Sequence, residues 1–466
     1  MTDYRSLLAE LAKAYRAHSP RSAALQERAE AVMVDGGSHT LRLLHPFPPR
    51  IVRAQGAWIE DEDGHRLLDF WQGHLGNLLG HNPEIVTSAL AQALHQPWGL
   101  QTGFTDALQI ETAEVFCRQT GSERVRFTTS GTLATMYAIF LARAHTGRRL
   151  VMKVGGGWHG AQPWALKGVD FHANGEPGFS SIESDGVPES VAGQVILTGF
   201  NDPERLCADF VQWGDQLAAF ILEPFLGAGG HIPASREYLH AARELTDRYG
   251  VVMILDEVIS GFRFRAGNLS ALYGIQPDLA TYGKIMGGGM PVSAVGGRAE
   301  IMELSGRKGG DRVKFSGGTY SAHPASMLAA KAMMTYLSEH EAEVYPRLAR
   351  LGALTRQTLV EALAAEGVQA ITTGSDAESL PDSPMFMVHF PLQAGVRADR
   401  PEDLANPALF DTALSRQVLN LALLLENVFL IKGHGTLTLA HTEADIQTLA
   451  DACRRAIRRV TRRDRV

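Results

Sequence analysis

The chain has 466 residues, of which 45% are hydrophobic and 20% are charged. It is therefore too apolar for general disorder, and long enough for two globular units around an enclosed reaction site. Lys and Arg number 44 against 51 Asp and Glu, which gives a formal net charge of -7 and disfavours nucleic acid as a partner.

The ends of the chain and the cysteines indicate a cytoplasmic protein. The N-terminal residues are amphipathic without an apolar signal segment, and no run of about 18 apolar residues occurs. Cys117, Cys207 and Cys453 are widely separated, so we expect no disulfide, no structural zinc and a reducing compartment. We interpret the arginine-rich residues 454–465 as the solvated face of a last helix.

The N-terminal part is predicted to be one helix followed by a small β-rich segment. Residues 1 to about 30 have helical periodicity, and RIVRAQGAWIEDEDGHRLLDF indicates strands around the Asp63–Gly64 turn. From about residue 75 to 325, short apolar runs alternate with helical stretches, which is typical of a mainly parallel sheet covered by helices. The six runs are VRFTTS, RLVMKV, GQVILTGF, LAAFILEPF, GVVMILDEV and DLATYGK.

Beyond about residue 325 the chain is strongly helical and ends with FMVHF, VFLIKG and a terminal helix. This pattern predicts a second α+β unit, completed by the N-terminal segment. The predicted domains are residues 1–75, which contribute to the small domain, a large domain 76–325 and a small C-terminal domain 326–466. In the large domain, the helix after Gly131 is expected to bury one stripe, formed by Leu133, Met136, Tyr137, Phe140, Leu141 and Ala144.

Two glycine-containing motifs have the pattern of ligand-binding turns. In FTTSGT, an apolar run meets a helix N-terminus at which Ser130, Gly131 and Thr132 are suited to hold a phosphate. In VGGGWHG, three glycines let the backbone approach a ligand, and the indole of Trp158 can lie flat on an aromatic ring. Taken alone, each motif is more often a simple helix cap or a tight turn around a core tryptophan.

Two further motifs place a charged side chain after an apolar run. GVVMILDEV leads to Asp256, and ligands of open α/β sheets gather at the carboxyl ends of strands. In TYGKIMGGGMPVSAVGG, Lys284 stands in a glycine-rich stretch, and a partly desolvated lysine can act as a Schiff-base nucleophile. A magnesium ligand or helix cap for Asp256, and a surface loop for Lys284, are the alternatives.

Together, the four motifs supply a phosphate cradle, a stacking aromatic ring, an acid at a strand end and an amine. Pyridoxal 5'-phosphate (PLP) needs these four groups for its phosphate, its ring, its pyridine nitrogen and its aldehyde. The sequence therefore predicts PLP as the cofactor, and it predicts no metal site.

From about residue 30 to 455, the sequence resembles the class III, or omega, aminotransferases of PLP fold type I. Within them it is most similar to the branch of glutamate-1-semialdehyde aminomutase and β-amino-acid aminotransferases. The motifs that carry the resemblance are GAWIEDEDGHRLLDF, TSGTLAT, GGWHG, ILEPFLGAGG, ILDEVISGFR, YGKIMGGGMPVSAVGG, SGGTYSAHP and LAHTEADI. It implies a large domain with a mainly parallel seven-stranded sheet covered by helices, a smaller α+β domain and a homodimer with shared active sites.

The resemblance also implies a role for individual residues. Lys284 forms the internal aldimine and moves the proton, while Asp256 pairs with the pyridinium nitrogen. Trp158 stacks on the ring, where the family more often has Tyr or Phe, and Val258 packs on the opposite face. The other implied contacts are Ser130, Gly131 and Thr132 at the phosphate, Thr319 at the phosphate of the other subunit, and Glu223 near the cofactor.

Four residues are candidates for the substrate side of the site. Arg42 and Lys432 are suited to attract a substrate carboxylate, although both also fit ordinary surface roles. Trp71 and His74 are pocket-wall residues by the resemblance. An aromatic wall suits aryl or bulky apolar amines and β-amino acids.

The resemblance leaves more than one reaction open. An aminomutase of this branch uses a Glu before the final strand, and alignment on His441 puts Gly433 at that position. We therefore expect an aminotransferase that moves an amino group from an amine or a β- or ω-amino acid to a keto acid or aldehyde by a ping-pong mechanism. Glutamate-1-semialdehyde 2,1-aminomutase and an amino-acid epimerase are the alternatives. A protein with a vestigial, silent site is disfavoured by the intact Lys284 and Asp256.

Overall fold

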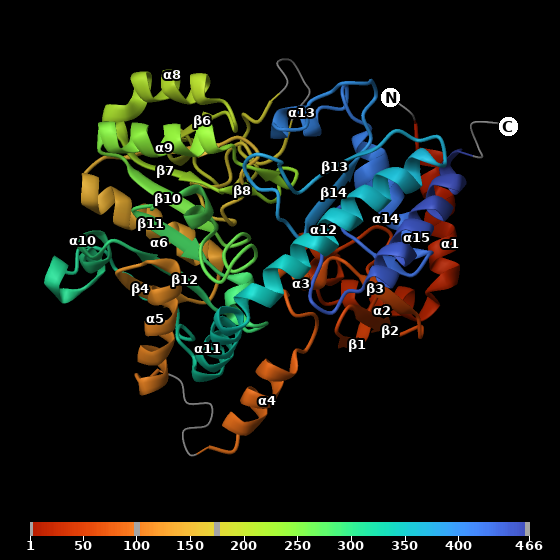
Figure 1. The fold of residues 1–466 in the computed structure, drawn as a ribbon, viewed down its shortest axis with the longest axis horizontal. Helices are drawn as coiled ribbons and strands as arrows, with labels where there is room; N and C mark the ends of the chain where they lie inside the picture. Colours follow the sequence, from red (N-terminus) through yellow and green to blue (C-terminus); the bar gives the residue numbers. More distant parts are fainter. Residues whose placement is uncertain (1–2, 97–102, 172–177, 462–466) are drawn as a thin grey trace.

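The computed structural model describes residues 3–96, 103–171 and 178–461 (Figure 1). One half of the molecule contains a large sheet with helices on both faces, and the other half contains both ends of the chain. The long helix α12, Glu341–Ala364, runs between the two halves. None of the helices in the described part of the chain has the length and apolar character needed to cross a bilayer.

The large sheet has seven strands in the order β4-β12-β11-β10-β7-β5-β6. Neighbouring strands are parallel, except that β12 runs antiparallel to both β11 and β4. This confirms the mainly parallel seven-stranded sheet. The strands are β4 Arg124–Thr128, β5 Leu150–Val154, β6 Val195–Thr198, β7 Leu217–Leu222, β10 Val252–Glu257, β11 Leu279–Tyr282 and β12 Ser293–Gly297.

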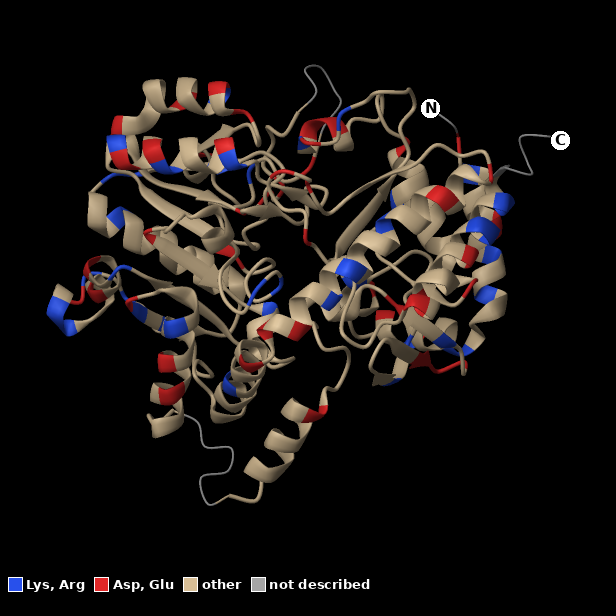
Figure 2. Ribbon diagram, viewed as in Figure 1, with Lys and Arg blue, Asp and Glu red and all other residues tan. Residues whose placement is uncertain are grey.

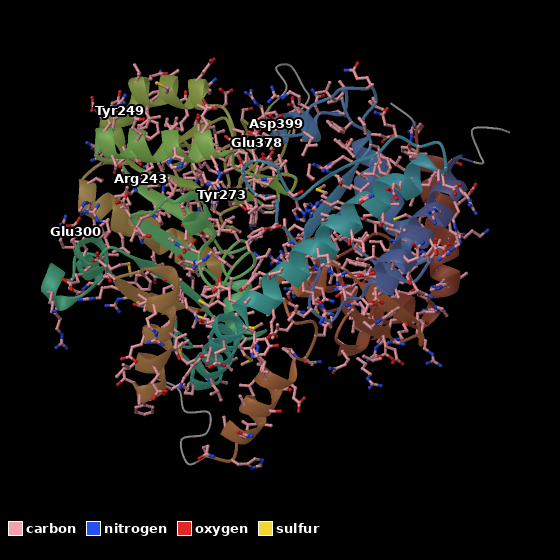
Figure 3. The ribbon with its side chains drawn as sticks, viewed as in Figure 1. Arg243, Tyr249, Tyr273, Glu300, Glu378 and Asp399 are labelled. Atoms are coloured by element: carbon pink, nitrogen blue, oxygen red, sulfur yellow. The ribbon has the colours of Figure 1, made fainter. Side chains whose placement is uncertain are left out.

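Every residue of β7 and β10 is buried because helices cover both faces of the sheet. Alternate residues of β7 point to opposite faces, so Ile221 packs with helix α6 and Leu222 packs in the core beneath α9. The covering helices are α5 Ala107–Thr120, α6 Gly131–Thr146, α8 Pro203–Trp213 and α9 Arg236–Tyr249. Figure 3 shows Arg243 on α9, whose guanidinium lies 3.1 Å from the carboxylate of Asp278 beside β11.

The buried stripe predicted for α6 is only partly right. Tyr137 and Leu141 are buried, whereas the other four predicted residues are only half-buried. The small residues Ala134, Ala138 and Ala142 are buried instead. Small side chains allow the helix to approach the sheet closely, and a search for large apolar residues overlooks them.

The N-terminal part forms two helices rather than the single predicted one. Helix α1, Arg5–His18, ends before Pro20, which begins α2, Pro20–Glu30. Proline has no N–H and fits the first turn of a helix, so a new helix starts there. The strands around Gly64 are β1 Ile51–Gln55, β2 Trp58–Asp61 and β3 Arg66–Asp69, and β15 Val428–Phe429 extends this sheet by pairing parallel to β3.

The C-terminal part adds a three-stranded sheet and the last helix. The sheet has the order β13-β14-β16 and consists of Ile371–Thr373, Met385–His389 and His434–Thr436. Helix α15, Glu443–Thr461, carries arginines that pair with Glu426 and Glu366 and lies on the outside of the molecule (Figure 2). The remaining helices are α3 Gln72–Leu75, α4 Glu84–Ala93, α7 Glu189–Ala192, α10 Ala299–Met302, α11 Pro324–Glu339, α13 Pro401–Ala405 and α14 Leu419–Leu424.

The predicted domain boundaries stay a prediction. Helix α11 packs against α4 and α5, so its contacts are with the half that contains the large sheet.

A short hairpin of β8, Phe225–Leu226, and β9, Ile232–Pro233, follows β7. It leads the chain from the end of β7 towards α9.

Candidate active site

A cavity of about 920 Å³ lies beside the carboxyl ends of β4 and β10 and the start of α6. Most of the residues singled out in the sequence line it together, although they come from distant parts of the chain. They are Arg42, Trp71, His74, Ser130, Gly131, Thr132, Trp158, Asp256 and Lys284. Glu223, Val258, Thr319 and Lys432 are not part of its lining.

Asp256 is a buried carboxylate at the end of β10 that three donors hold in place. Thr281 Oγ1 on the neighbouring strand donates to Oδ1 over 2.9 Å, and the Val258 N–H donates to the same oxygen over 3.1 Å. His159 Nδ1 lies 2.8 Å from Oδ2 and donates to it. Burial lowers the pKa of His159, so its ring is neutral. The carboxyl group at this strand end is therefore fixed in position.

Lys284 follows β11 and has a left-handed backbone with φ of 48°. The preceding Gly283 lies so close to Ser293 that a Cβ atom would be 2.7 Å from its Oγ. Burial lowers the pKa of the Lys284 amine to about 8, although the charges of Asp256 and Glu223 oppose the shift. About a tenth of the amine is thus unprotonated at pH 7, far more than for an ordinary lysine, and the unprotonated form is the nucleophile.

The turn before α6 has features that suit an anion. The first N–H groups of a helix have no partner within the helix, and its dipole favours negative charge there. Ser130 caps the helix, because its side chain accepts from the Leu133 N–H over 3.3 Å. The neighbouring loop touches the cradle at Gly160, where a Cβ atom would lie 2.6 Å from Thr132 Cα. Val258 packs behind it, 3.0 Å from the position of a Cβ on Gly131.

Trp158 is positioned by Glu223. The Trp158 N–H donates to Glu223 Oε1 over 3.0 Å, and the Gly227 N–H donates to Oε2 over 2.9 Å. Burial, followed by the charge of Asp256, raises the pKa of Glu223 to about 8. Trp158 is 37% exposed and lines the cavity, so it is accessible to a ligand there.

Arg42 and Lys432, the two candidates for binding a carboxylate, lie in different places. Arg42 lines the cavity, and its guanidinium has no acidic partner among the described residues. Lys432 is exposed, and only its neighbour Ile431 reaches the cavity wall. Thr319 is exposed as well and does not reach the cavity of its own chain.

The sequence alone does not indicate His159 and Thr281 as partners of Asp256. Thr281 stands opposite Asp256 in the parallel register of β10 and β11, so the order of the strands would have revealed it. His159 follows Trp158 in the GGWHG motif, but no local pattern shows that its ring turns towards β10. The described residues contain no group of His, Cys, Asp and Glu side chains arranged for a metal ion.

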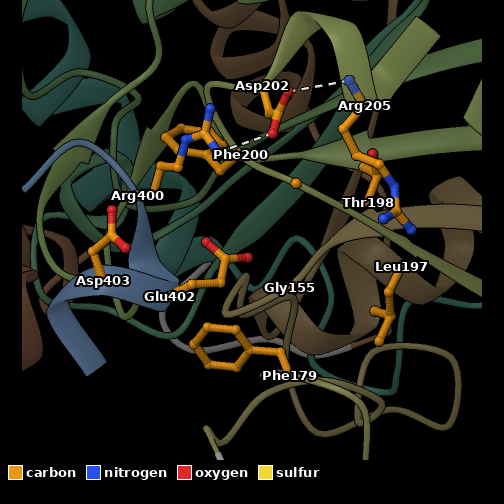
Figure 4. A pocket seen from close by; sticks show the side chains of 11 residues that line it. Gly155, Phe179, Leu197, Thr198, Phe200, Asp202, Arg205, Arg400, Glu402 and Asp403 are labelled. Carbon is orange, nitrogen blue, oxygen red and sulfur yellow. Dashed lines mark hydrogen bonds and ion pairs between the residues drawn. The ribbon is translucent and has the colours of Figure 1, made fainter. Parts of the chain in front are cut away.

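A second, smaller pocket of about 340 Å³ lies between the end of β6 and α13 (Figure 4). Asp202 lines this pocket. It accepts a hydrogen bond from the Arg205 N–H and pairs with Arg400 at 2.9 Å. None of the residues singled out in the sequence lines this pocket. The chemistry therefore belongs to the cavity around Lys284.

Comparison with known proteins decides the family. The family described as Aminotransferase class-III matches residues 43–373, which is more than half of the chain. The chain belongs to the class-III aminotransferases. This class-III aminotransferase is 34% identical to glutamate-1-semialdehyde 2,1-aminomutase of Halorubrum lacusprofundi, over 94% of its own length and 99% of the relative's.

Solved structures share the fold of this class-III aminotransferase. An omega-transaminase from Sphaerobacter thermophilus matches with a TM-score of 0.83 at 32% identity, covering 94% of this chain and 97% of the other. A β-phenylalanine aminotransferase from Variovorax paradoxus matches with a TM-score of 0.83 at 29% identity and covers 97% of each chain. These matches confirm the predicted PLP fold type I.

The protein is therefore a PLP-dependent enzyme, as the sequence predicts. Its cavity suits this cofactor. The N-terminus of α6 offers N–H donors for a phosphate, the buried carboxyl group of Asp256 suits a pyridinium nitrogen, and the accessible Trp158 suits an aromatic ring. The amine of Lys284, with its lowered pKa, suits an aldehyde.

Proposed function

We propose that this enzyme is an aminotransferase that moves the amino group of a β- or ω-amino acid, or of an amine, to a keto acid or aldehyde. The observation that carries the proposal is the exposed Arg42, which lies on the wall of the cavity that contains Lys284 and has no acidic partner among the described residues. The two carboxylates of that wall, Asp69 and Asp256, already accept several hydrogen bonds each. Arg42 is thus available to pair with the carboxylate of a substrate.

Within this proposal, each residue has a separate task. Bound PLP supplies an electrophilic aldehyde and an electron-withdrawing ring. Asp256 keeps the ring nitrogen protonated, and its three donors keep the carboxylate in place. Nζ of Lys284 would move a proton between the substrate carbon and the cofactor, and Trp158 would restrain the ring. Ser130, Gly131 and Thr132 hold the phosphate.

Incubation of the holoenzyme with a donor alone tests the proposal. β-Phenylalanine or 1-phenylethylamine should convert the cofactor to its amine form, seen as loss of visible absorbance, and pyruvate or 2-oxoglutarate should restore it. An epimerase would invert the chirality of the donor without this conversion. If no donor of a panel that includes α-amino acids changes the spectrum, the proposed function is wrong.

A second candidate is glutamate-1-semialdehyde 2,1-aminomutase, which the name of the Halorubrum relative favours over an aminotransferase. Against it stands Gly433, which occupies the position of the aminomutase Glu and donates its N–H to Asn420 Oδ1 over 3.2 Å. No further carboxylate lines the described wall of the cavity. Steady turnover of glutamate-1-semialdehyde without any keto acid would establish this candidate instead.

We further propose a cytoplasmic homodimer in which Thr319 contacts the phosphate in the partner's site. The exposure of Thr319 outside its own cavity supports this assignment. Mixing the inactive variants K284A and T319A, with brief denaturant treatment to exchange subunits, tests it. A mixed dimer would contain one site with both residues intact, so activity should return. No recovery in dimers shown to have exchanged would reject the shared site.

A further inference from the structure

The segment after β5 forms a closed loop, residues 156–168, which carries Trp158 to the wall of the cavity. We call it the Trp158 loop. Its ends meet, because the Gly156 N–H donates to the Gly168 carbonyl oxygen over 2.8 Å. Compact loops whose ends meet in this way are often functional. The position of the indole therefore depends on what holds this loop in place.

The base of the Trp158 loop rests on a buried lysine of β5. Nζ of Lys153 donates to the carbonyl oxygens of Ala165 over 3.2 Å and of Lys167 over 2.8 Å. In the described part of the chain, no other donor reaches either oxygen. The lysine is fully buried, which is rare for this residue type. A side chain from within the large sheet thus holds the backbone next to the point where the loop closes.

Packing alone does not explain a lysine at this position. Its neighbours across the sheet are Leu197 of β6 and Ile221 of β7, which are both apolar. Burial lowers the pKa of the Lys153 amine to about 7, although the charges of Glu223 and Glu183 oppose the shift. Burying an amine is costly, and an apolar side chain would avoid that cost. The two carbonyl oxygens at the base of the loop are therefore what the amine is placed to hold.

The front of the loop is held at the cavity by separate contacts. The Trp158 N–H donates to Glu223 Oε1 over 3.0 Å, and the Thr135 hydroxyl donates to the His159 carbonyl oxygen over 2.6 Å. Residues 155–157, which precede the indole, are all glycine and offer little resistance to a change of backbone direction. A loop held only at the front would be free to pivot about these contacts. Lys153 supplies the second support that prevents this movement.

We propose that Lys153 is a positioning residue of the cofactor site, which holds the base of the Trp158 loop so that the indole lies against the PLP ring. The proposal rests on that part of the proposed function in which Trp158 restrains the ring. It applies to any reaction of the bound cofactor, so it is independent of the choice between an aminotransferase and an aminomutase. It gives a task in the site to a residue that does not line the cavity.

Substitutions of three residues separate this role from general stability. K153M keeps an unbranched side chain but removes the amine, and W158L removes the indole itself. K167M is the matched control, because Lys167 Nζ also donates to two carbonyl oxygens, those of Ala192 over 3.2 Å and Val195 over 2.8 Å. Titration of each apoenzyme with PLP gives the dissociation constant. Circular dichroism of the bound cofactor, which is itself achiral, reports the asymmetry of its surroundings.

We expect K153M to weaken PLP binding about tenfold and to reduce the visible dichroism of the cofactor, whereas K167M stays within about twofold of the parent. Backbone hydrogen exchange of residues 155–168 should become faster in K153M, with no change in α9. In the W158L background, K153M should weaken PLP binding at most about threefold, because the indole through which Lys153 acts is already gone.

The full effect of K153M in the W158L background, or equal effects of K153M and K167M, would overturn the proposal, since both outcomes indicate a role in stability alone. Unchanged PLP affinity in K153M or in W158L overturns it as well. If K153M fails to fold, K153Q, whose side chain is too short to reach both carbonyl oxygens, takes its place in the same comparison. PLP binding needs no amino transfer, so these titrations are separate from the donor incubation that tests the proposed function.

Discussion

His159 Nδ1 and Asp256 Oδ2 lie 2.8 Å apart, and both side chains are buried. His159 lies in the loop after β5 and Asp256 lies in β10, so the hydrogen bond joins the Trp158 loop to the end of β10. It fixes both the orientation of the carboxylate and the position of the loop that carries the indole. Asp256, the candidate acid of the site, is thus held by a histidine that lines the same cavity.

Replacing His159 should therefore slow the reaction without emptying the site. H159L leaves a buried carboxylate with one donor fewer, which corresponds to about 1.5–3 kcal/mol, or about tenfold to hundredfold in kcat. H159N should retain part of the activity, because its amide occupies the position of Nδ1. PLP content and single-turnover rates check this prediction. Unchanged turnover in H159L would show that the hydrogen bond does not matter for catalysis.

Cofactor uptake should depend on pH through Lys284. Its pKa is lowered to about 8, so the unprotonated fraction rises with pH up to that value and levels off above it. Below it, the rate at which the apoenzyme binds PLP should fall about tenfold per pH unit. Stopped-flow absorbance from about pH 6 to pH 9 measures the rate. A profile that keeps rising towards the ordinary lysine pKa would contradict the lowered value.

Gly160 should tolerate substitution less well than a glycine that has a similar positive φ but no atoms near the position of a Cβ. In G160A the new Cβ would collide with Thr132, and φ is 81°. We expect a loss of about 1–3 kcal/mol in stability and weaker PLP binding. G147A is the matched control, because φ there is 71° and nothing lies within 4 Å of a Cβ. Equal effects of both variants on PLP affinity would exclude the contact as the cause.

Much of the site follows from the sequence because each of its groups belongs to a short local pattern. A buried strand that ends in Asp256, a lysine among glycines and a capped helix after a strand each have a chemical meaning that a few adjacent residues convey. Their convergence follows from the parallel sheet, which brings the carboxyl ends of distant strands to one edge.

Other features depend on contacts that no local pattern encodes. Gln72, His74 and Leu75 give no sign of a left-handed turn, since Asp69 and Arg263 impose it from outside. The partnership of His159 with Asp256 depends on strand order. The sequence does not predict strand β12. Ser, Ala and Gly dominate Ser293–Gly297, so this buried strand lacks the run of large apolar residues that indicates a buried strand. The break between the first two helices, in contrast, can be predicted from the sequence, because Pro20 favours the start of a new helix.

The most direct test of the account is to locate the covalent attachment of the cofactor. Borohydride reduction of the holoenzyme, digestion and mass spectrometry should find the pyridoxyl label on the peptide that contains Lys284. The variant K284A should lack both the label and turnover. A label on the buried Lys153 or another lysine, or full turnover in K284A, would contradict the central claim.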